Sequence, residues 1–225
     1  MRRAESWHFW FRVRRARLTR EITKRLAVRN SFLEVGCGTG YLASHLAGQG
    51  LRVTGCDLFT GSCENARFRL VRADAVHLPF ANRSFRSLGL FDVIEHLDEP
   101  ENALAEAFRV LEPGGFLFLT VPAMPFLWGT MDEKGGHRRR YLLAGVRKSL
   151  ADSGFLVCKA SYMFPGLVPA IYLRRNRPSY GEDQMSVSRL ANILGLAFFF
   201  VEDVLLSFIR WPWGISILVI GQKPA

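Results

Sequence analysis

The chain has 225 residues, 49% of them hydrophobic and 22% charged, a composition that excludes intrinsic disorder and favours one globular domain. Its formal net charge is +10, with ten lysines and arginines inside residues 2–29; such basic surface attracts nucleic acid, anionic lipid or anionic small substrates, so charge alone does not select the partner. The four cysteines form no CxxC pair, and the first residues are too polar for a secretory signal, so we expect a reduced, cytoplasmic protein.

The first predicted element is a helix. Apolar residues recur at helical spacing over residues 5–28, with arginines between them. Trp7, Trp10 and Phe11 stand at its start, and we expect them to pack against the protein. The alternative is a surface that meets acidic lipid or nucleic acid, although no recognisable nucleic-acid-binding motif supports the latter.

Strands and helices then alternate along the chain. Strands are predicted at residues 32–35, 51–56, 68–73, 87–94 and 116–121, helices at 41–47 and 102–110, and a turn at 113–115. Such alternation predicts parallel β-α units in a doubly wound α/β sheet.

The second half of the chain is less regular. It predicts a long loop at 122–141, a helix at 141–153, a strand at 155–162, an irregular segment at 163–186, an apolar helix at 188–209 and a strand at 215–220. The uncharged run at 190–201 has 12 residues, whereas a membrane span needs about 20. We expect a core or acceptor-covering helix; docking of this region and Trp211 and Trp213 on a membrane surface is the alternative.

Three glycines follow the first strand. Gly36, Gly38 and Gly40 fall as GxGxG, and glycine permits positive φ and close approach of a ligand to the backbone. A dinucleotide-binding loop reads GxGxxG, which would require glycine or alanine at Tyr41. The loop therefore fits a dinucleotide poorly. The residues at the ends of the neighbouring strands are needed to identify the ligand.

Three carboxylates stand where a nucleoside would need them. Asp57 ends the second strand, where a carboxylate can accept both ribose hydroxyls. Asp74, followed by Ala75, ends the third and can bind an adenine amino group, while Glu34 can orient a charged amino-acid group or hold the loop's amides. Ligands bind outside the carboxyl ends of strands in such sheets. Taken singly, Asp57 and Asp74 could be ordinary turn or helix caps; together with the glycines they indicate a nucleoside site.

The segments LEVGCGTG, VTGCDLF, VRADAVHLPF, FDVIEHLDEP and RVLEPGGFLFLTVP, in this order, resemble class I S-adenosylmethionine-dependent methyltransferases over roughly residues 30–122. The resemblance implies a three-layer α/β/α Rossmann-like fold with a seven-stranded, mostly parallel sheet whose last strand, 215–220, is antiparallel. It implies S-adenosylmethionine as cofactor and S-adenosylhomocysteine as product, with the three glycines around the methionine moiety, Asp57 at the ribose and Asp74 at the adenine. The cofactor site is then expected to include Glu34, Gly36, Cys37, Gly38, Gly40, Asp57, Leu58, Asp74, Ala75 and Phe91.

We expect one methyltransferase domain over residues 1–225, with a basic amphipathic lid at 1–29, a core sheet from 30–162 and 215–222, and an inserted apolar cap at 163–214. The expected acceptor is a small molecule or a glycan- or lipid-linked precursor, methylated at oxygen, with peripheral membrane contact as a further option. We do not expect a nucleic-acid partner. The alternatives are an RNA or protein methyltransferase and a non-catalytic protein that binds S-adenosylmethionine.

Methyl transfer from a sulfonium is an in-line displacement, in which the protein mainly aligns the acceptor and excludes water. A base is required only if the acceptor keeps its proton near neutral pH. The resemblance places the acceptor beside the end of the fourth strand, so Glu95, His96 and the distant His137 are the expected catalytic residues. The alternative is that Glu95 and His96 cap the next helix and support the donor pocket.

Asp92-x-x-Glu95-His96 with His137 is also similar to an arrangement in ubiquinone-pathway O-methyltransferases and in enzymes that methylate the terminal ribose of small RNAs. There a metal orients hydroxyl oxygens of the acceptor, and carboxylates and imidazoles are suitable ligands. Asp92 is shorter than a glutamate at that position, so we expect no metal and keep this arrangement as an alternative.

The sequence DEKGGHRRRY, residues 132–141, follows the fifth strand and is expected over the mouth of the site. Its two glycines allow movement, Arg138–Arg140 can bind an anionic acceptor, and Tyr141 can line the acceptor pocket. The alternative is a solvated basic loop in which His137 caps the next helix.

Overall fold

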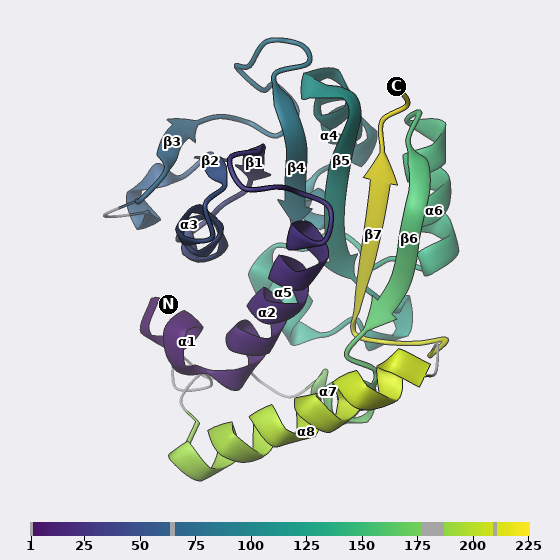
Figure 1. Cartoon of the computed structure of the whole chain (residues 1–225). Helices are drawn as coiled ribbons and strands as arrows, with labels where there is room; N and C mark the ends of the chain where they lie inside the picture. Colours follow the sequence, from purple (N-terminus) through teal and green to yellow (C-terminus); the bar gives the residue numbers. More distant parts are fainter. Residues whose placement is uncertain (1, 64–65, 177–186, 209–210) are drawn as a thin grey trace.

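A seven-stranded sheet forms the centre of the computed structural model, which describes residues 2–63, 66–176, 187–208 and 211–225 (Figure 1). The strand order is β3-β2-β1-β4-β5-β7-β6. Strands β1 to β5 pair in parallel, and β7 is antiparallel to both of its neighbours. The doubly wound, mostly parallel sheet predicted from the sequence is therefore confirmed, including its antiparallel last strand.

The strands are β1 (Ser31–Val35), β2 (Arg52–Asp57), β3 (Arg69–Arg72), β4 (Phe85–Phe91), β5 (Leu111–Pro122), β6 (Leu156–Met163) and β7 (Ser216–Gln222). The α-helices are α1 (Arg2–Trp7), α2 (Phe9–Thr23), α3 (Tyr41–Gly48), α4 (Pro100–Val110), α5 (Thr130–Gly135), α6 (Leu143–Asp152), α7 (Val168–Arg174) and α8 (Arg189–Phe208). Four short 3₁₀ turns are also described: η1 (Thr60–Ser62), η2 (Ile94–His96), η3 (Pro125–Leu127) and η4 (Pro165–Leu167).

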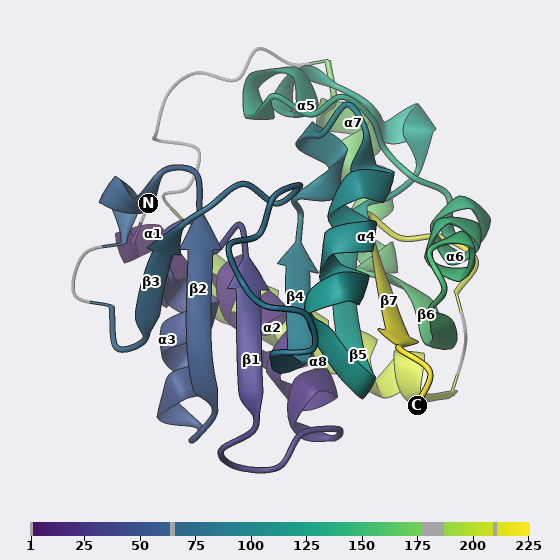
Figure 2. The ribbon, with the colours of Figure 1, turned by 90° about the horizontal axis from the view of Figure 1, so that it is seen from above.

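Helices cover both faces of the sheet, which gives the three layers (Figure 2). Successive residues of a strand point to opposite faces, so Phe32 of β1 joins one core and Leu33 the other. The core around Leu33 lies under α4 and α6, and the core around Phe32 lies under α2 and α3. The central parallel strands β1 and β4 are buried on both faces, which explains why their sequences are mostly apolar, whereas the edge strand β3 is partly exposed.

The helix predicted over residues 5–28 is wrong in its continuity and its end. The chain breaks at His8, whose extended backbone separates α1 from α2, and α2 ends at Thr23. The imidazole Nδ1 of His8 accepts a hydrogen bond from the Trp10 amide at 3.1 Å and so caps α2. The apolar spacing continues through this cap, so it could not reveal the break.

Other differences lie where short helices replace expected coil. The loop predicted at 122–141 contains η3 and α5, and the irregular segment predicted at 163–186 contains η4 and α7, although residues 177–186 lie outside the described part. The turn predicted at 113–115 lies inside β5, whose register against β4 shifts between Phe85 and Ser87. Strand β4 ends at Phe91 rather than at residue 94, because Asp92 takes a left-handed φ of 56°.

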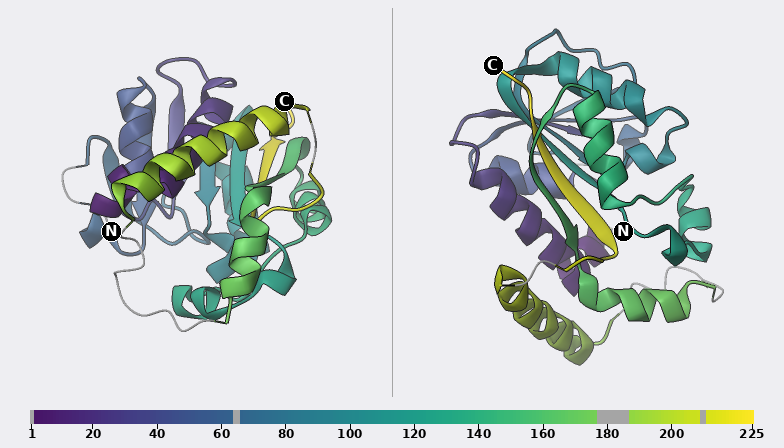
Figure 3. Two further views of the ribbon diagram at one scale, coloured as in Figure 1. Left: turned by 90° about the horizontal axis from the view of Figure 1, so that it is seen from below. Right: turned by 90° about the vertical axis from the view of Figure 1, so that its right-hand side faces the viewer.

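Helix α8 lies across α2 on the outside of the molecule, away from the sheet (Figures 1 and 3). It confirms the predicted apolar helix, except that residue 209 lies outside the described part. The prediction that this helix lies in the core is wrong for its outer face, where Ile193 and Phe200, for example, are 62% and 72% exposed. Within the described residues, no helix combines the length and apolarity that a membrane crossing requires.

Candidate functional site

The glycine loop leaves β1 at the carboxyl edge of the sheet. Gly36, Gly38 and Gly40 have φ values of +71°, +52° and +72°, which L side chains rarely adopt. A Cβ at Gly36 would lie 2.5 Å from the Val93 side chain, and one at Gly40 would lie 2.5 Å from Sγ of Cys63. A Cβ at Gly38 would have nothing within 4 Å. The outer glycines are thus required by packing, while the middle one borders open space that a ligand can approach.

Asp57, the last residue of β2, is tied directly to this loop. Its Oδ2 accepts a hydrogen bond from the Gly38 amide at 2.8 Å, and its Oδ1 accepts one from the Phe59 amide at 2.9 Å. Each carboxylate oxygen can accept more than one hydrogen bond, so ribose hydroxyls can still donate to Asp57. Leu58, the next residue, is 47% exposed beside it. The structure brings these predicted residues together because β1 and β2 are parallel neighbours.

Asp74 and Ala75 follow β3, the strand next to β2. Oδ1 of Asp74 accepts a hydrogen bond from the Val76 amide at 3.1 Å, so the turn-capping role is present in the structure. This bond leaves acceptor capacity on the carboxylate, and Ala75 is buried beneath it. The cap and a contact to an adenine amino group are therefore compatible.

Cys37 and Phe91, which are predicted in the cofactor site, have buried side chains. Cys37 is 6% exposed, burial raises the pKa of its thiol, and its amide donates to the carbonyl of Cys56. Phe91 is 8% exposed and packs in the core under α2 and α3. Phe91 and the Cys37 thiol therefore shape the site from within the protein.

Glu34, at the end of β1, is a buried carboxyl group beneath the loop. It is 5% exposed, and burial raises its pKa to about 8, although the charge of Arg14 opposes this shift. Its Oε2 has no hydrogen-bond partner among the described residues. A cation that reached this carboxyl would therefore restore its ionised form.

Helices α1 and α2 attach to the same loop. Oγ1 of Thr39 donates to Oε2 of Glu5 at 2.6 Å, and Arg15 both hydrogen-bonds the hydroxyl of Tyr41 and lies 4.6 Å from the centre of its ring. The aromatic residues differ from the lid prediction: the Trp10 ring packs 4.4 Å from that of Phe164 instead of over the glycines. Polar and basic side chains, rather than aromatic ones, thus join this segment to the loop.

A three-residue cluster at the ends of β4 and β5 was missed by the sequence reasoning. The Arg14 guanidinium contacts Asp92 at 2.6 Å and donates to the Thr120 hydroxyl at 3.0 Å. These residues lie far apart in the chain, so no local pattern indicates the cluster. Asp92 is consequently bound to Arg14. It does not belong to the group of Glu95, His96 and His137.

Glu95, His96 and His137, the three predicted catalytic residues, come together. One oxygen or nitrogen atom from each lies within 4.8 Å of the others, and the two imidazole rings meet nearly edge to face with centres 4.9 Å apart. Glu95 is fully buried, and burial together with the nearby Asp92 raises its pKa. Within the described part of the chain, neither Glu95 carboxylate oxygen has a hydrogen-bond partner. This is a compact titratable group with unsatisfied acceptors.

Asp132 orients one member of this group and was not predicted. It is 1% exposed, and Oδ1 accepts from Nδ1 of His137 at 2.8 Å and from Nε of Arg140 at 2.9 Å. Nδ1 of His96 donates to the carbonyl of Gly136 at 3.2 Å. With both Nδ1 atoms assigned as donors from these contacts, each Nε2 carries a free lone pair. His137 does not cap α6, whose N-cap is Leu142.

The basic loop is anchored to the protein. Arg138 pairs with Asp98 and donates to the carbonyl of His96, and Arg139 donates to the carbonyls of Leu97 and Asp98. Arg140 binds Asp132 and the carbonyl of Ala123. Since all three guanidinium groups hold protein atoms, the contacts favour positioning of the loop over capture of an anionic acceptor.

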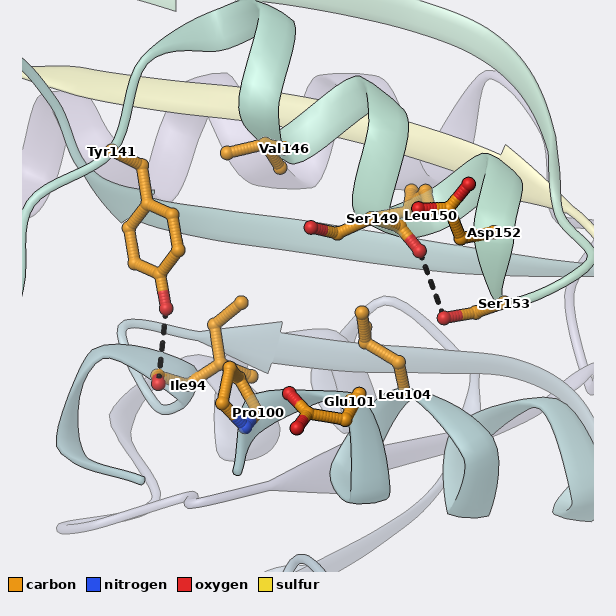
Figure 4. Close-up of a pocket in the computed structure, with 10 residues that line it drawn as sticks. All are labelled: Ile94, Pro100, Glu101, Leu104, Tyr141, Val146, Ser149, Leu150, Asp152 and Ser153. Carbon is orange, nitrogen blue, oxygen red and sulfur yellow. Dashed lines mark hydrogen bonds between the residues drawn. The ribbon is translucent and has the colours of Figure 1, made fainter. Parts of the chain in front are cut away.

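One cavity of the described structure lies beside this region, and the lining of a second contains none of the residues of this region. The first, of 290 Å³, lies between α4 and α6, where the Tyr141 hydroxyl donates to the carbonyl of Ile94 (Figure 4). Burial raises the pKa of Tyr141 to about 12, so its hydroxyl stays protonated. The second, of 770 Å³, is lined by residues of α2, α6 and β6. The lining of the first cavity contains Ile94 and Tyr141 but none of the predicted cofactor or catalytic residues.

Comparison with known proteins finds similarity to methyltransferases. Residues 33–119 match the family model described as a methyltransferase domain. The Mycolicibacterium smegmatis protein named "Probable S-adenosylmethionine-dependent methyltransferase" is 36% identical over 51% of this chain and 46% of its own length. The O-methyltransferase cnsE of Penicillium expansum is 36% identical over 46% of this chain and 42% of its own. The chain thus spans less than half the length of these relatives.

The fold is matched over a greater length. The crystal structure of a SAM-dependent methyltransferase from Archaeoglobus fulgidus superimposes with a TM-score of 0.63 at 18% identity, covering 93% of this chain and 92% of that one. Its likeness covers the sheet and its helices, whereas the family model covers the glycine loop and the strands as far as β5. Residues 33–119 are therefore similar to a methyltransferase domain, and the chain as a whole shares the fold of a SAM-dependent methyltransferase.

Proposed function

We propose that this protein transfers the methyl group of S-adenosylmethionine to an oxygen atom of a small-molecule, glycan-linked or lipid-linked acceptor. The hydrogen bond from the Gly38 amide to Asp57 carries the proposal, because it lies beside open space at the ends of two parallel strands. Ligands of doubly wound sheets bind at this edge. The relatives whose names specify O-methylation support oxygen as the acceptor atom.

In the proposed binding mode, the parts of S-adenosylmethionine contact the predicted residues in order along the carboxyl edge of the sheet. Its methionine moiety lies on the glycine loop, the ribose hydroxyls donate to Asp57, and the adenine amino group donates to Asp74. The donor's ammonium group lies near enough to Glu34 to favour the ionised carboxylate. Residues 2–29 form the lid, since Glu5 and Arg15 join them to the loop, and the described residues between 163 and 214 form the cap.

The reaction is an in-line displacement. The acceptor oxygen forms a bond to the methyl carbon as the carbon–sulfur bond breaks, leaving S-adenosylhomocysteine. The acceptor's hydroxyl proton passes to Nε2 of His96 or His137, whose lone pairs are free because each Nδ1 donates to a protein oxygen. Buried Glu95, with its raised pKa, remains neutral beside them.

A second candidate is metal-assisted transfer to the same acceptor. It is favoured by the grouping of Glu95, His96 and His137 within 4.8 Å and by the unpartnered Glu95 oxygens of the described structure. A carboxylate and two imidazoles form a suitable ligand set, and a divalent metal there would orient and polarise acceptor oxygens. Titration with Mn²⁺ decides between the two: binding that Glu95→Gln and His137→Ala each abolish supports the metal, and no binding supports the base.

The cofactor is tested by calorimetric titration with S-adenosylhomocysteine, with NADH in parallel. Micromolar binding of S-adenosylhomocysteine alone supports the proposal, whereas binding of NADH alone contradicts it. Acceptors are then screened with donor labelled in the methyl group. Labelling of RNA or peptides in place of small acceptors would favour the alternative substrate classes.

The catalytic residues are tested with the acceptor so identified. If His96 or His137 is the base, its replacement by alanine lowers kcat by about 10²–10⁴-fold and leaves S-adenosylhomocysteine affinity unchanged. Unchanged turnover in both variants would show that neither His96 nor His137 acts as a base. Donor binding without turnover of any acceptor would support a non-catalytic protein.

A further inference from the structure

Helix α8 has an outer face that is entirely apolar. In its described residues, eight large apolar side chains between Leu190 and Leu205 are 46% to 72% exposed. Leucine, isoleucine, valine and phenylalanine repeat here at helical spacing, so they form one continuous strip along the helix. An exposed apolar surface of this extent marks a site of interaction.

Three polar residues of α8, Asn192, Glu202 and Asp203, face the rest of the protein. Asn192 is 2% exposed and Oδ1 accepts a hydrogen bond from the Phe9 amide at 2.6 Å. Glu202 is 6% exposed, pairs with Arg17 at 3.0 Å and accepts from the Gly166 amide at 2.8 Å. Asp203 pairs with Arg17 and with Arg20. Because the helix is fixed through its polar side, its apolar side is held outward by specific contacts.

The charge of the protein indicates what covers this face. The net charge is +10, and exposed Arg189 starts the helix. Helix α7, which lies at the same end of the molecule, has a 73% exposed Leu173 and ends at exposed Arg174 (Figures 1 and 3). Apolar side chains edged by arginines match the interface of an anionic bilayer, where the former enter the acyl region and the latter meet lipid phosphates.

We propose that the outer face of α8, together with Leu173 of α7, docks this protein on the surface of an anionic lipid membrane. The helix lies parallel to the bilayer, since the polar side chains on its inner face remain bound to α2 and to the backbone of Gly166. Docking does not require the proposed methyl transfer, and either can fail without the other.

The test is flotation of the full-length protein with vesicles of phosphatidylcholine containing phosphatidylglycerol. The wild type is expected to float with these vesicles and to bind pure phosphatidylcholine more weakly, by about fivefold or more. Ile193→Glu/Phe200→Glu places two charges on the strip and is expected to lower vesicle binding at least about tenfold. Raised salt should also weaken binding of the wild type.

The matched control is Leu142→Glu/Leu156→Glu. These leucines are 53% and 59% exposed but lie outside α7 and α8, and their replacement should leave binding within about twofold of wild type. Circular dichroism and thermal unfolding establish that each variant is folded.

Three results would overturn the proposal: no flotation of the wild type, equal flotation of both double variants, or loss of the wild type's self-association in the Ile193→Glu/Phe200→Glu protein without any vesicle binding. The last result would mean that a second copy of the chain, and not a membrane, covers the outer face of α8.

Discussion

The Arg14 guanidinium and the Asp92 carboxylate lie 2.6 Å apart, and the Thr120 hydroxyl donates to the same carboxylate at 2.9 Å. This contact joins helix α2 to the ends of β4 and β5, next to the glycine loop. Asp92 reaches it because its φ of 56° turns the chain at the end of β4, and its amide donates to the carbonyl of Thr120. The ion pair therefore helps to hold α2 against the ends of these strands.

Arg14→Ala should loosen α2. The pair is partly exposed, so we expect only about a two- to fivefold loss of S-adenosylhomocysteine affinity, together with faster amide hydrogen exchange in residues 9–23. Lys148→Ala, which removes the exposed pair with Asp152, is the control and should change neither. Unchanged exchange in α2 would show that Arg14 does not hold the helix.

Asp57→Ala should weaken S-adenosylhomocysteine binding by about 1–3 kcal/mol, as expected for the loss of charge-assisted hydrogen bonds. Calorimetry measures this directly. Asp57 also holds the amides of Gly38 and Phe59, so Asp57→Asn, which keeps one acceptor oxygen, separates loss of the loop from loss of ribose contacts. Affinity equal to wild type in both variants would remove Asp57 from the site.

Glu34→Gln should change how stability depends on pH. Burial raises the folded-state pKa from 4.5 to about 8, so between these values the folded protein binds more protons than the unfolded chain. The free energy of unfolding must therefore fall as pH rises through this window. We expect Glu34→Gln to remove about 1–4 kcal/mol of that decline without ligand, as measured by urea unfolding at each end of the window.

Burial also raises the pKa of Glu95, so it contributes a decline of the same sign. Glu95→Gln should remove the part of the decline that Glu95 causes. In the Glu34→Gln/Glu95→Gln double variant, the free energy of unfolding should depend less on pH than in either single variant. A Glu34→Gln protein with the wild-type pH profile would mean that Glu34 ionises freely in the folded state.

Asp132→Asn should impair the orientation of His137. Asp132 touches no proposed substrate atom, so its effect is positional: we expect kcat to fall about 10–100-fold with S-adenosylhomocysteine affinity unchanged. The specific readout is the ¹⁵N NMR signature of His137, whose Nδ1-protonated tautomer should become less populated. Asp98→Asn, at the exposed pair with Arg138, is the control. An unaltered tautomer would contradict the role.

Local patterns predicted the parts of the fold that local physics determines. The alternation of apolar strands with helices is set by burial of the sheet, and the positive φ values of Gly36 and Gly40 favour glycine. The meeting of Asp57 with Gly38 also followed, because parallel neighbouring strands end at the same edge.

The unpredicted features depend on contacts between distant segments. Arg14 meets Asp92, and Asp132 orders the loop through Arg140 and His137, without any periodic pattern. Helix α7 forms in a proline- and arginine-rich stretch, and the cap at His8 interrupts a continuous apolar spacing. The family model, at residues 33–119, likewise ends before Asp132 and His137.

Helix α2 is bound on two sides. Arg14 joins it to Asp92, and Arg17, about one turn later, joins it to Glu202 and Asp203 on α8 at 3.0 and 2.7 Å. A ligand that displaces α8 must therefore move α2 or break the Arg17 pairs. If α2 moves, linkage requires reciprocity: whatever binds α8 changes donor affinity by a factor equal to that by which the donor changes the affinity at α8.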